Sequence, residues 1–120
     1  MSSPSSRPGI EWQDIGGVAV VHFITPVLRD ERAIQAAFDA LNGMIESGRT
    51  DVVINFHGLK GIASLAIGKL VRLNDRLQPP EGRLVLCALT PIVNEIMDIM
   101  QLRKRFQIYP TEQAALESFL

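Results

Sequence analysis

Ser64 is the side chain whose type and position in this sequence most directly suggest chemistry. It lies in the stretch GIASLAIGKL, where a glycine-containing loop gives way to a helical pattern. A hydroxyl at the start of a helix can cap it by accepting a hydrogen bond from a backbone N–H, which is worth about 1 kcal/mol relative to alanine. It can also carry a phosphate, because free N–H groups and the helix dipole stabilise an anion there. The residues alone leave both roles open, and the two roles are compatible.

The histidines do not form a recognisable catalytic or metal-binding group. His22 lies inside the strand-like run VAVVHF and His57 follows INF, and neither has a cysteine or carboxylate at metal-ligand spacing. We expect His22 to have no chemical role, whereas His57 begins a loop and is a candidate contact residue. The sequence has neither a phosphate-binding Gly-x-x-x-x-Gly-Lys loop nor a dinucleotide fingerprint. No histidine lies near Ser64 in the sequence to act as its base, so we expect no enzymatic activity, no cofactor and no metal.

Charge and composition argue against nucleic acids and membranes as partners. The 120 residues carry a net charge of −1, and the short basic run Arg103–Arg105 is typical of a helix end that faces water. No apolar run reaches the roughly 20 residues that span a bilayer, and MSSPSSRPG lacks the apolar stretch of a signal peptide. Cys87, the single cysteine, lies in the apolar run LVLCAL and is expected to be buried. These features predict a cytoplasmic protein with one hydrophobic core.

Hydrophobic periodicity predicts an opening hairpin followed by alternating helices and strands. Gly16 and Gly17 separate two strand-like stretches, which is typical of a two-residue hairpin turn. Residues 1–9 are rich in Ser and Pro and are expected to form a flexible tail, which leaves residues 10–120 as the domain. The elements expected after the hairpin are a helix from Asp30 to Gly48, a strand at Asp51–Phe56, a helix at Ser64–Leu77, a strand at residues 83–89, a helix from Thr90 to about Gln101, a strand at residues 106–109 and a helix from Pro110 onward.

This order of elements predicts a single domain of the α/β class. Strands that alternate with helices pair in parallel, whereas the opening hairpin pairs antiparallel. We therefore expect a small mixed sheet, made of the hairpin and the parallel strands, flanked by four helices.

Two stretches of the sequence resemble the STAS domain family, the anti-sigma-factor antagonists. They are DVVINFHGLKGIASLAIGKLVRLNDRL and GRLVLCALTPIVNEIMDIMQLRKRFQIYPTEQAAL, and the similarity runs from about Val18 to the C-terminus. In that family the helix after the central strand begins with Asp-Ser-Ser-Gly or Asp-Ser-Thr-Gly, and the first serine is phosphorylated by an anti-sigma factor that is also a kinase. The resemblance places Ser64 at the phosphoacceptor position.

The resemblance also implies partners for the chain. The unphosphorylated form of such a protein binds the anti-sigma factor and frees the sigma factor, and a metal-dependent phosphatase reverses the modification. Contact in this chain would come from the loop after the central strand and from the helix that follows. The partner-binding candidates are Asn55, His57, Gly58, Lys60, Gly61, Ile62, Ala63, Ser64, Leu65 and Ile67.

The sequence departs from the family pattern around the phosphoacceptor position. Ala63 replaces the aspartate, Leu65 replaces the second hydroxyl residue, Ala66 replaces the glycine, and Asn55 ends a strand that often ends in aspartate in relatives. Fewer acids leave less negative charge to repel a phosphate. Their loss also removes a carboxylate that could orient the serine hydroxyl for transfer.

Apolar residues in two segments are candidates for contact with another protein. Ala63, Leu65 and Ile67 are expected to make the exposed edge of the Ser64 helix apolar, which favours docking. The helix that follows Thr90 is apolar over much of its surface, so it is either packed in the core or partly turned to a partner. Its apolar residues are Ile92, Val93, Ile96, Met97, Ile99 and Met100, with the Ile92–Ile96–Ile99 line as the simplest core-facing side.

These observations leave one leading function and two alternatives. The leading hypothesis is a non-enzymatic anti-sigma-factor antagonist that is switched by phosphorylation of Ser64. The first alternative is a STAS scaffold or transporter-associated module without phosphorylation. The second is a small-molecule binder that holds a nucleotide or a lipid beside the loop.

Overall fold

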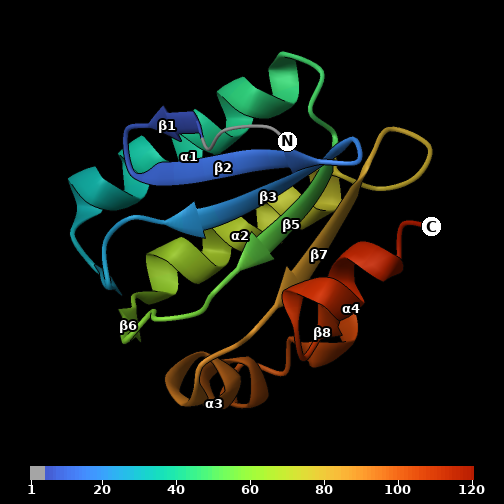
Figure 1. Cartoon of the computed structure of the whole chain (residues 1–120). Helices are drawn as coiled ribbons and strands as arrows, with labels where there is room; N and C mark the ends of the chain where they lie inside the picture. The colour runs from blue at the N-terminus through green and yellow to red at the C-terminus, as the bar shows by residue number, and fades with distance from the viewer. Residues whose placement is uncertain (1–4) are drawn as a thin grey trace.

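The computed structural model describes residues 5–120 and has an α/β architecture built on one main sheet (Figure 1). The six strands of this sheet lie in the order β1-β2-β3-β5-β7-β8, and β4 and β6 form a separate two-stranded sheet. The strands are β1 (Ser5–Arg7), β2 (Ile10–Ile15), β3 (Val18–Phe23), β4 (Val27–Leu28), β5 (Asp51–Asn55), β6 (Gly61–Ile62), β7 (Arg83–Cys87) and β8 (Gln107–Tyr109). The helices are α1 (Glu31–Glu46), α2 (Ser64–Arg76), α3 (Pro91–Ile99), a 3-10 turn (Arg103–Arg105) and α4 (Glu112–Glu117).

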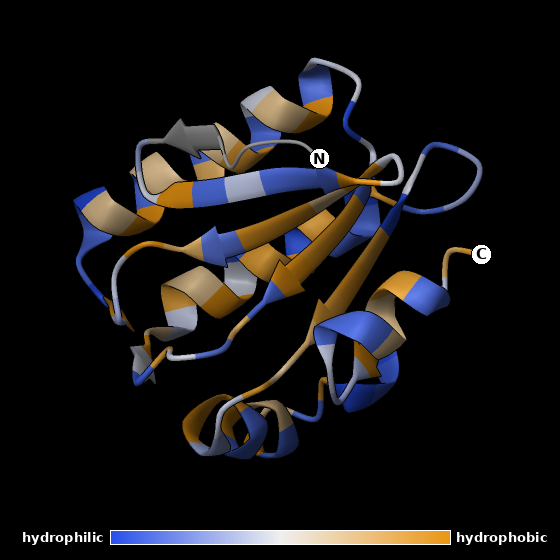
Figure 2. Cartoon of the chain, viewed as in Figure 1, coloured by the Kyte–Doolittle hydropathy of each residue, from blue (hydrophilic) through white to orange (hydrophobic). Residues whose placement is uncertain are grey.

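The main sheet is mixed, as the sequence predicts. Strands β2 and β3 form the expected antiparallel hairpin around Gly16 and Gly17. Strands β3, β5, β7 and β8 are mutually parallel, so their carboxyl ends lie at one edge of the sheet. In Figure 2 the three central strands β3, β5 and β7 are mostly hydrophobic, which is the pattern of strands covered on both faces.

Each face of the sheet packs against its own helices. Helices α1, α2 and α3 cover one face and form the larger hydrophobic cluster, which includes Phe38, Leu70 and Met97. Helix α4 covers the other face and forms a smaller cluster with Val53 and Cys87. Cys87 is fully buried, as expected from the apolar run that contains it.

The expectation of a flexible tail over residues 1–9 is wrong for part of that segment. Residues 1–4 lie outside the described residues, but Ser5–Arg7 form β1, which pairs antiparallel with β2. The turn that makes this pairing possible contains Gly9, whose φ of +85° suits glycine and whose α-carbon faces Ala37 of α1. A Cβ at this position would lie 2.8 Å from the Ala37 backbone, so only glycine lets the chain turn this close to α1.

Helix α3 begins as predicted but buries a different side. Thr90 occupies the N-cap position and Pro91 the first helical position, and the helix ends at Ile99 rather than near Gln101. Val93 and Met97 are fully buried, whereas Ile99 is 71% exposed. The Ile92–Ile96–Ile99 line is therefore not the core-facing side, because both sides of this helix are apolar and only the packing distinguishes them.

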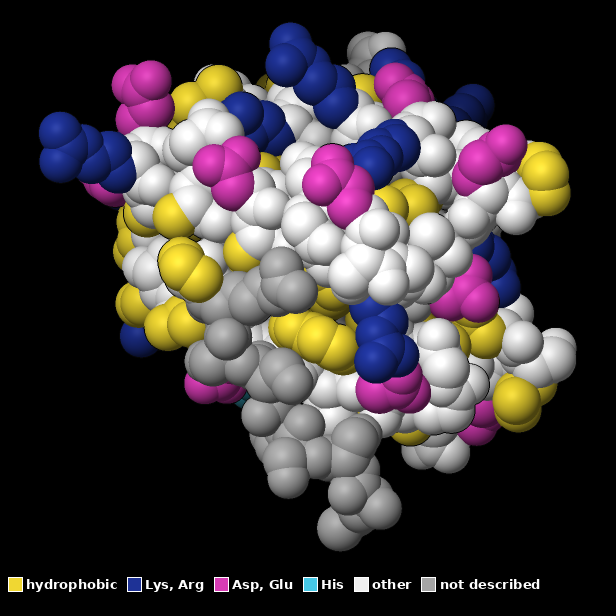
Figure 3. Space-filling model, turned by 90° about the horizontal axis from the view of Figure 1, so that it is seen from above, with side chains coloured by type: hydrophobic (Ala, Val, Ile, Leu, Met, Phe, Trp, Pro, Cys, Tyr) yellow, Lys and Arg dark blue, Asp and Glu magenta, His cyan; other side chains and the backbone are white. Residues whose placement is uncertain are grey.

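The basic run Arg103–Arg105 forms an exposed 3-10 turn whose arginines pair with acids. Arg103 pairs with Asp98 of α3 and Arg105 with Asp75 of α2, so the run does not form a free basic patch. Figure 3 shows the molecule from above, where basic and acidic side chains are interspersed over the surface. Within residues 5–120, no helix combines the length and the hydrophobicity needed to cross a bilayer.

Candidate functional site

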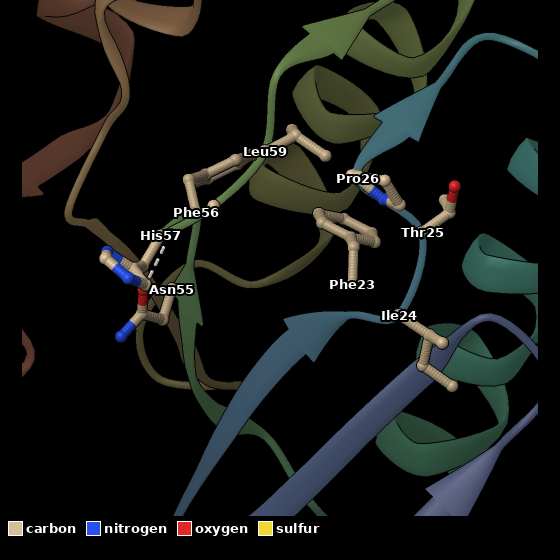
Figure 4. A pocket seen from close by; sticks show the side chains of 9 residues that line it. Phe23, Ile24, Thr25, Pro26, Asn55, Phe56, His57 and Leu59 are labelled. Carbon is tan, nitrogen blue, oxygen red and sulfur yellow. Dashed lines mark hydrogen bonds between the residues drawn. The ribbon is translucent and has the colours of Figure 1, made fainter.

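The candidate site lies where β3 and β5 end, at the carboxyl edge of the parallel strands. The residues that follow β5 form the β5–α2 loop (residues 56–63), which connects to the helix that carries Ser64. A pocket of about 210 Å³ lies between this loop and the segment that follows β3 (Figure 4). Its apolar wall includes Phe23 and Phe56, whose ring centroids are 5.8 Å apart. The edge of an open α/β sheet where parallel strands end is a common place for binding sites.

Backbone hydrogen bonds fix the second half of the loop. Lys60 donates its N–H to the carbonyl of Pro26 at 2.6 Å, and Ala63 donates to Leu28 at 2.9 Å. Between these two bonds, β6 pairs in parallel with β4. The short sheet therefore ties the start of α2 to the segment after β3, although neither two-residue strand has a periodicity that the sequence could reveal.

Ser64 does not cap α2 but occupies its first helical position. Ala63 is the N-cap residue, with extended dihedral angles and no side-chain hydrogen bond. Ala66 and Ile67 both donate to the Ala63 carbonyl, which leaves the N–H groups of Ser64 and Leu65 outside the helical hydrogen-bond ladder. The hypothesis that Ser64 is only the N-cap is therefore wrong. Its side chain is exposed and makes no hydrogen bond with another described residue.

Only part of the expected apolar edge is exposed. Leu65 is 46% exposed beside Ser64 and Ala63 is half-buried. Ile67 and Ile62 are 0% and 7% exposed, so the expectation that Ile67 lies on the exposed edge is wrong. Ile67 lies three residues before the buried Leu70, on the side of α2 that packs in the core, so it is buried although Ser64 and Leu65 are exposed.

The first half of the loop is held by Asn55, the last residue of β5. The Asn55 side chain is buried, and its Oδ1 accepts a hydrogen bond of 2.8 Å from the N–H of His57 (Figure 4). Its Nδ2 donates at 3.0 Å to Oε1 of Glu112 in α4. The side chains of His57 and Lys60 are exposed, and Gly58, also exposed, has a φ of +84°. Gly61 is buried, so it shapes the loop from within.

The electrostatic surroundings of Ser64 suit an added anion. The first turn of α2 contains no acidic residue. Arg29 lies next to the loop, since a Cβ at Gly61 would be 3.2 Å from its Nη2, and the Arg29 guanidinium pairs with no other described side chain. Among residues 5–120 there is no cluster of histidine, cysteine and acidic side chains suited to a metal ion.

Sequence reasoning missed two parts of this site. Phe23 ends β3 and Pro26 follows it, and a sequence reading that takes β3 and β5 as neighbours places both beside the loop. No sequence signal links Glu112 to this site, because it lies 57 residues from Asn55 and only the packing of α4 brings the two together. His22, expected to have no role, lies next to Asn55 in the sheet, with its Nε2 3.8 Å from Glu112 Oε1.

Comparison with solved structures supports the fold strongly. The chain superposes on an anti-sigma-factor antagonist (STAS) domain protein from Planctomyces limnophilus with a TM-score of 0.80 and 23% identity, covering 92% of this chain and 97% of that one. It superposes on the phosphorylated form of the Bacillus cell fate determinant SpoIIAA with a TM-score of 0.68 and 16% identity, covering 92% and 99% of the two chains. It also matches murine Slc26a9, an anion transporter, with a TM-score of 0.64 and 20% identity, covering 88% of this chain and 18% of the transporter.

Sequence comparison gives the family directly. No curated protein matches the chain in a pairwise search. The family model of the STAS domain, however, matches residues 10–115, which is nearly the whole chain and includes the β5–α2 loop and Ser64. The chain therefore belongs to the STAS domain family.

Proposed function

We propose that this chain is a non-enzymatic, cytoplasmic anti-sigma-factor antagonist whose partner is a serine-kinase-type anti-sigma factor. The observation that carries the proposal is Ser64 itself, an exposed hydroxyl at the first position of α2 that makes no hydrogen bond within residues 5–120. The exposed Leu65 beside it supplies an apolar contact that a partner would bury. The partner-binding surface in this proposal is the exposed part of the β5–α2 loop together with the first turn of α2.

Phosphorylation of Ser64 is the proposed switch. The Oγ of Ser64 attacks the γ-phosphorus of ATP held by the partner, the bond to ADP breaks, and the hydroxyl proton passes to solvent or to a base of the partner. The product places about two negative charges at a surface that is partly apolar and has no acidic residue in the first turn of α2. Binding is then lost by repulsion and desolvation, and a phosphatase that removes the phosphate restores it.

Substitution of Ser64 tests the switch by isothermal titration calorimetry with the kinase-type anti-sigma factor of the host. Ser64→Asp is expected to weaken binding by about tenfold or more, which corresponds to about 1.4 kcal/mol or more. Ser64→Ala is expected to bind as the wild type does. The control is Ser47→Asp, which adds the same charge at an exposed serine outside the proposed surface, the C-cap residue of α1, whose hydroxyl donates to the Met44 carbonyl. Equal affinity of the wild type and Ser64→Asp would contradict the proposal.

A transporter-associated module is the second candidate, favoured by the superposition on a segment of an anion transporter. In that role Ser64 would carry no phosphate. The replacement of the family aspartate by Ala63 would then not impair function, because no phosphate transfer to Ser64 is needed. Intact-mass measurement of the chain purified from its host separates the two: a phosphorylated fraction that Ser64→Ala abolishes supports the switch. The pocket beside the loop, at about 210 Å³, is below the roughly 300–1,000 Å³ of typical small-molecule sites, so we propose no nucleotide or lipid ligand there.

A further inference from the structure

A row of side chains crosses the sheet at the carboxyl ends of its parallel strands. His22, Asn55, Cys87 and Tyr109 are direct neighbours in register on β3, β5, β7 and β8. Residues paired in this way point to the same face of a sheet, which here is the face that α4 covers. Glu112, in the first turn of α4, reaches Asn55 in this row.

The Asn55 amide is fixed in one orientation by what lies on its two sides. Its NH₂ group donates to the Glu112 carboxylate, and its oxygen accepts from the His57 N–H. If the amide were turned over, its oxygen would face a carboxylate and its NH₂ would face an N–H, so two attractive contacts would become two repulsive ones. The acceptor oxygen of Glu112 on one side and the N–H of His57 on the other therefore make Asn55 present its own oxygen to His57.

The bond to His57 holds the first half of the β5–α2 loop, directly after the N–H of Phe56 has bonded to the carbonyl of Cys87 at 3.0 Å. It closes a side-chain-to-backbone turn of the kind that asparagine forms two residues ahead, and the N–H of Leu59 then bonds to the carbonyl of Phe56. The later half of the loop is held independently by Lys60 and Ala63. A change at Asn55 should therefore act mainly on His57 and Gly58, which are the exposed residues in the first half of the loop.

We propose that Glu112 is a positioning residue for the partner-binding loop: acting through Asn55, it holds the exposed His57–Gly58 segment in the form that a partner meets. The proposal rests on the proposed function, because it assumes that the partner contacts this loop. It assigns α4, which lies on the opposite face from α2, a role in setting the shape of the contact surface.

Two substitutions and their combination test the proposal through the amide exchange rate of His57, measured by NMR on the chain alone. Asn55→Asp puts a second carboxylate about 3 Å from Glu112 and should speed exchange roughly tenfold or more, because like charges repel and the turn opens. Glu112→Gln should change the rate little, since its carbonyl still accepts from Asn55. In the double variant the new glutamine amide donates to the new aspartate, whose other oxygen accepts from His57, so the rate should return toward the wild-type value.

Controls separate positioning from a general loss of stability. Exchange at Val53, in the centre of β5, reports global opening, and the rate for His57 is expressed relative to it. Asn74→Asp alters another buried asparagine, which donates to the carbonyl of Arg105, and it should leave this ratio unchanged. The proposal is overturned if the ratio of His57 to Val53 exchange in the double variant is no closer to the wild-type ratio than the ratio in Asn55→Asp alone.

The affinity for the kinase-type anti-sigma factor, measured for the same variants, completes the test. It should fall with Asn55→Asp and recover in the double variant. If exchange follows the expected pattern while affinity stays constant in all variants, the loop is not positioned for the partner and the proposal fails. Failure of the proposed function shows separately, as equal affinity of the wild type and Ser64→Asp.

Discussion

Ser64 and Cys87 are the two side chains with the strongest nucleophilic potential, and the fold gives them opposite surroundings. Ser64 is exposed at the start of α2, where the adjacent backbone N–H groups are free of helical partners. Cys87 is fully buried at the end of β7. Burial, and secondarily the negative charge of Glu112, raises the pKa of the Cys87 thiol from 9.0 to about 12. Chemistry at this end of the sheet is therefore open to the hydroxyl and closed to the thiol.

The shifted pKa of Cys87 predicts a pH dependence of stability. Above pH 9 the unfolded chain loses the thiol proton while the folded chain keeps it, so ionisation favours unfolding between about pH 9 and pH 12. Relative to Cys87→Ala, the wild type should lose up to about 1.4 kcal/mol of unfolding free energy per pH unit in this window. Urea unfolding of both proteins at pH 8, 9.5 and 10.5 measures the difference. If the free energy of unfolding changes with pH in the same way in the two proteins, the pKa of the Cys87 thiol is not raised by folding.

At the scale of elements, the sequence predicts those that have a periodicity and misses those that depend on tertiary pairing. The hairpin of β2 and β3, the strands β5, β7 and β8, and all four helices are confirmed near the predicted positions. Strands β1, β4 and β6 have two or three residues each, too few for an alternating pattern, and exist because neighbouring chain supplies partners. For the same reason the position of the loop near Ser64 was predicted, but the contacts that hold it were not.

Two glycines, one inside α2 and one after it, lead to opposite predictions. Gly68 lies inside α2 with open space where a Cβ would be, so Gly68→Ala should raise the free energy of unfolding by about 1 kcal/mol. Gly82 precedes β7, and a Cβ there would clash with the carbonyl oxygen of Thr50. Gly82→Ala should therefore lower the free energy of unfolding, by about 1–3 kcal/mol. Chemical denaturation of the two variants measures both changes.

Gly68 also bears on the contact surface, because it lies one turn after Ser64 on the exposed side of α2. If a partner packs closely along this turn, Gly68→Ala should stabilise the fold and weaken binding together. A variant that gains stability and keeps full affinity would place the partner away from this turn.

At the scale of the whole molecule, the fold gathers the residues of the proposed contact surface at one end of the sheet. The parallel strands bring the β5–α2 loop, the segment after β3 and the first turn of α4 to one edge. The sequence could indicate which loop follows the central strand, and the family resemblance could indicate Ser64. It could not indicate Glu112, since a contact across 57 residues depends on how α4 folds back on the sheet.

Hydrogen–deuterium exchange of the complete chain, with and without the kinase-type anti-sigma factor, tests the central claim most directly, because it maps where the partner binds. The account predicts that the partner slows exchange in residues 56–68, which comprise the β5–α2 loop and the start of α2. It predicts no such change at the outer surface of α4, residues 112–117. Protection of α4 with none in residues 56–68 would contradict it.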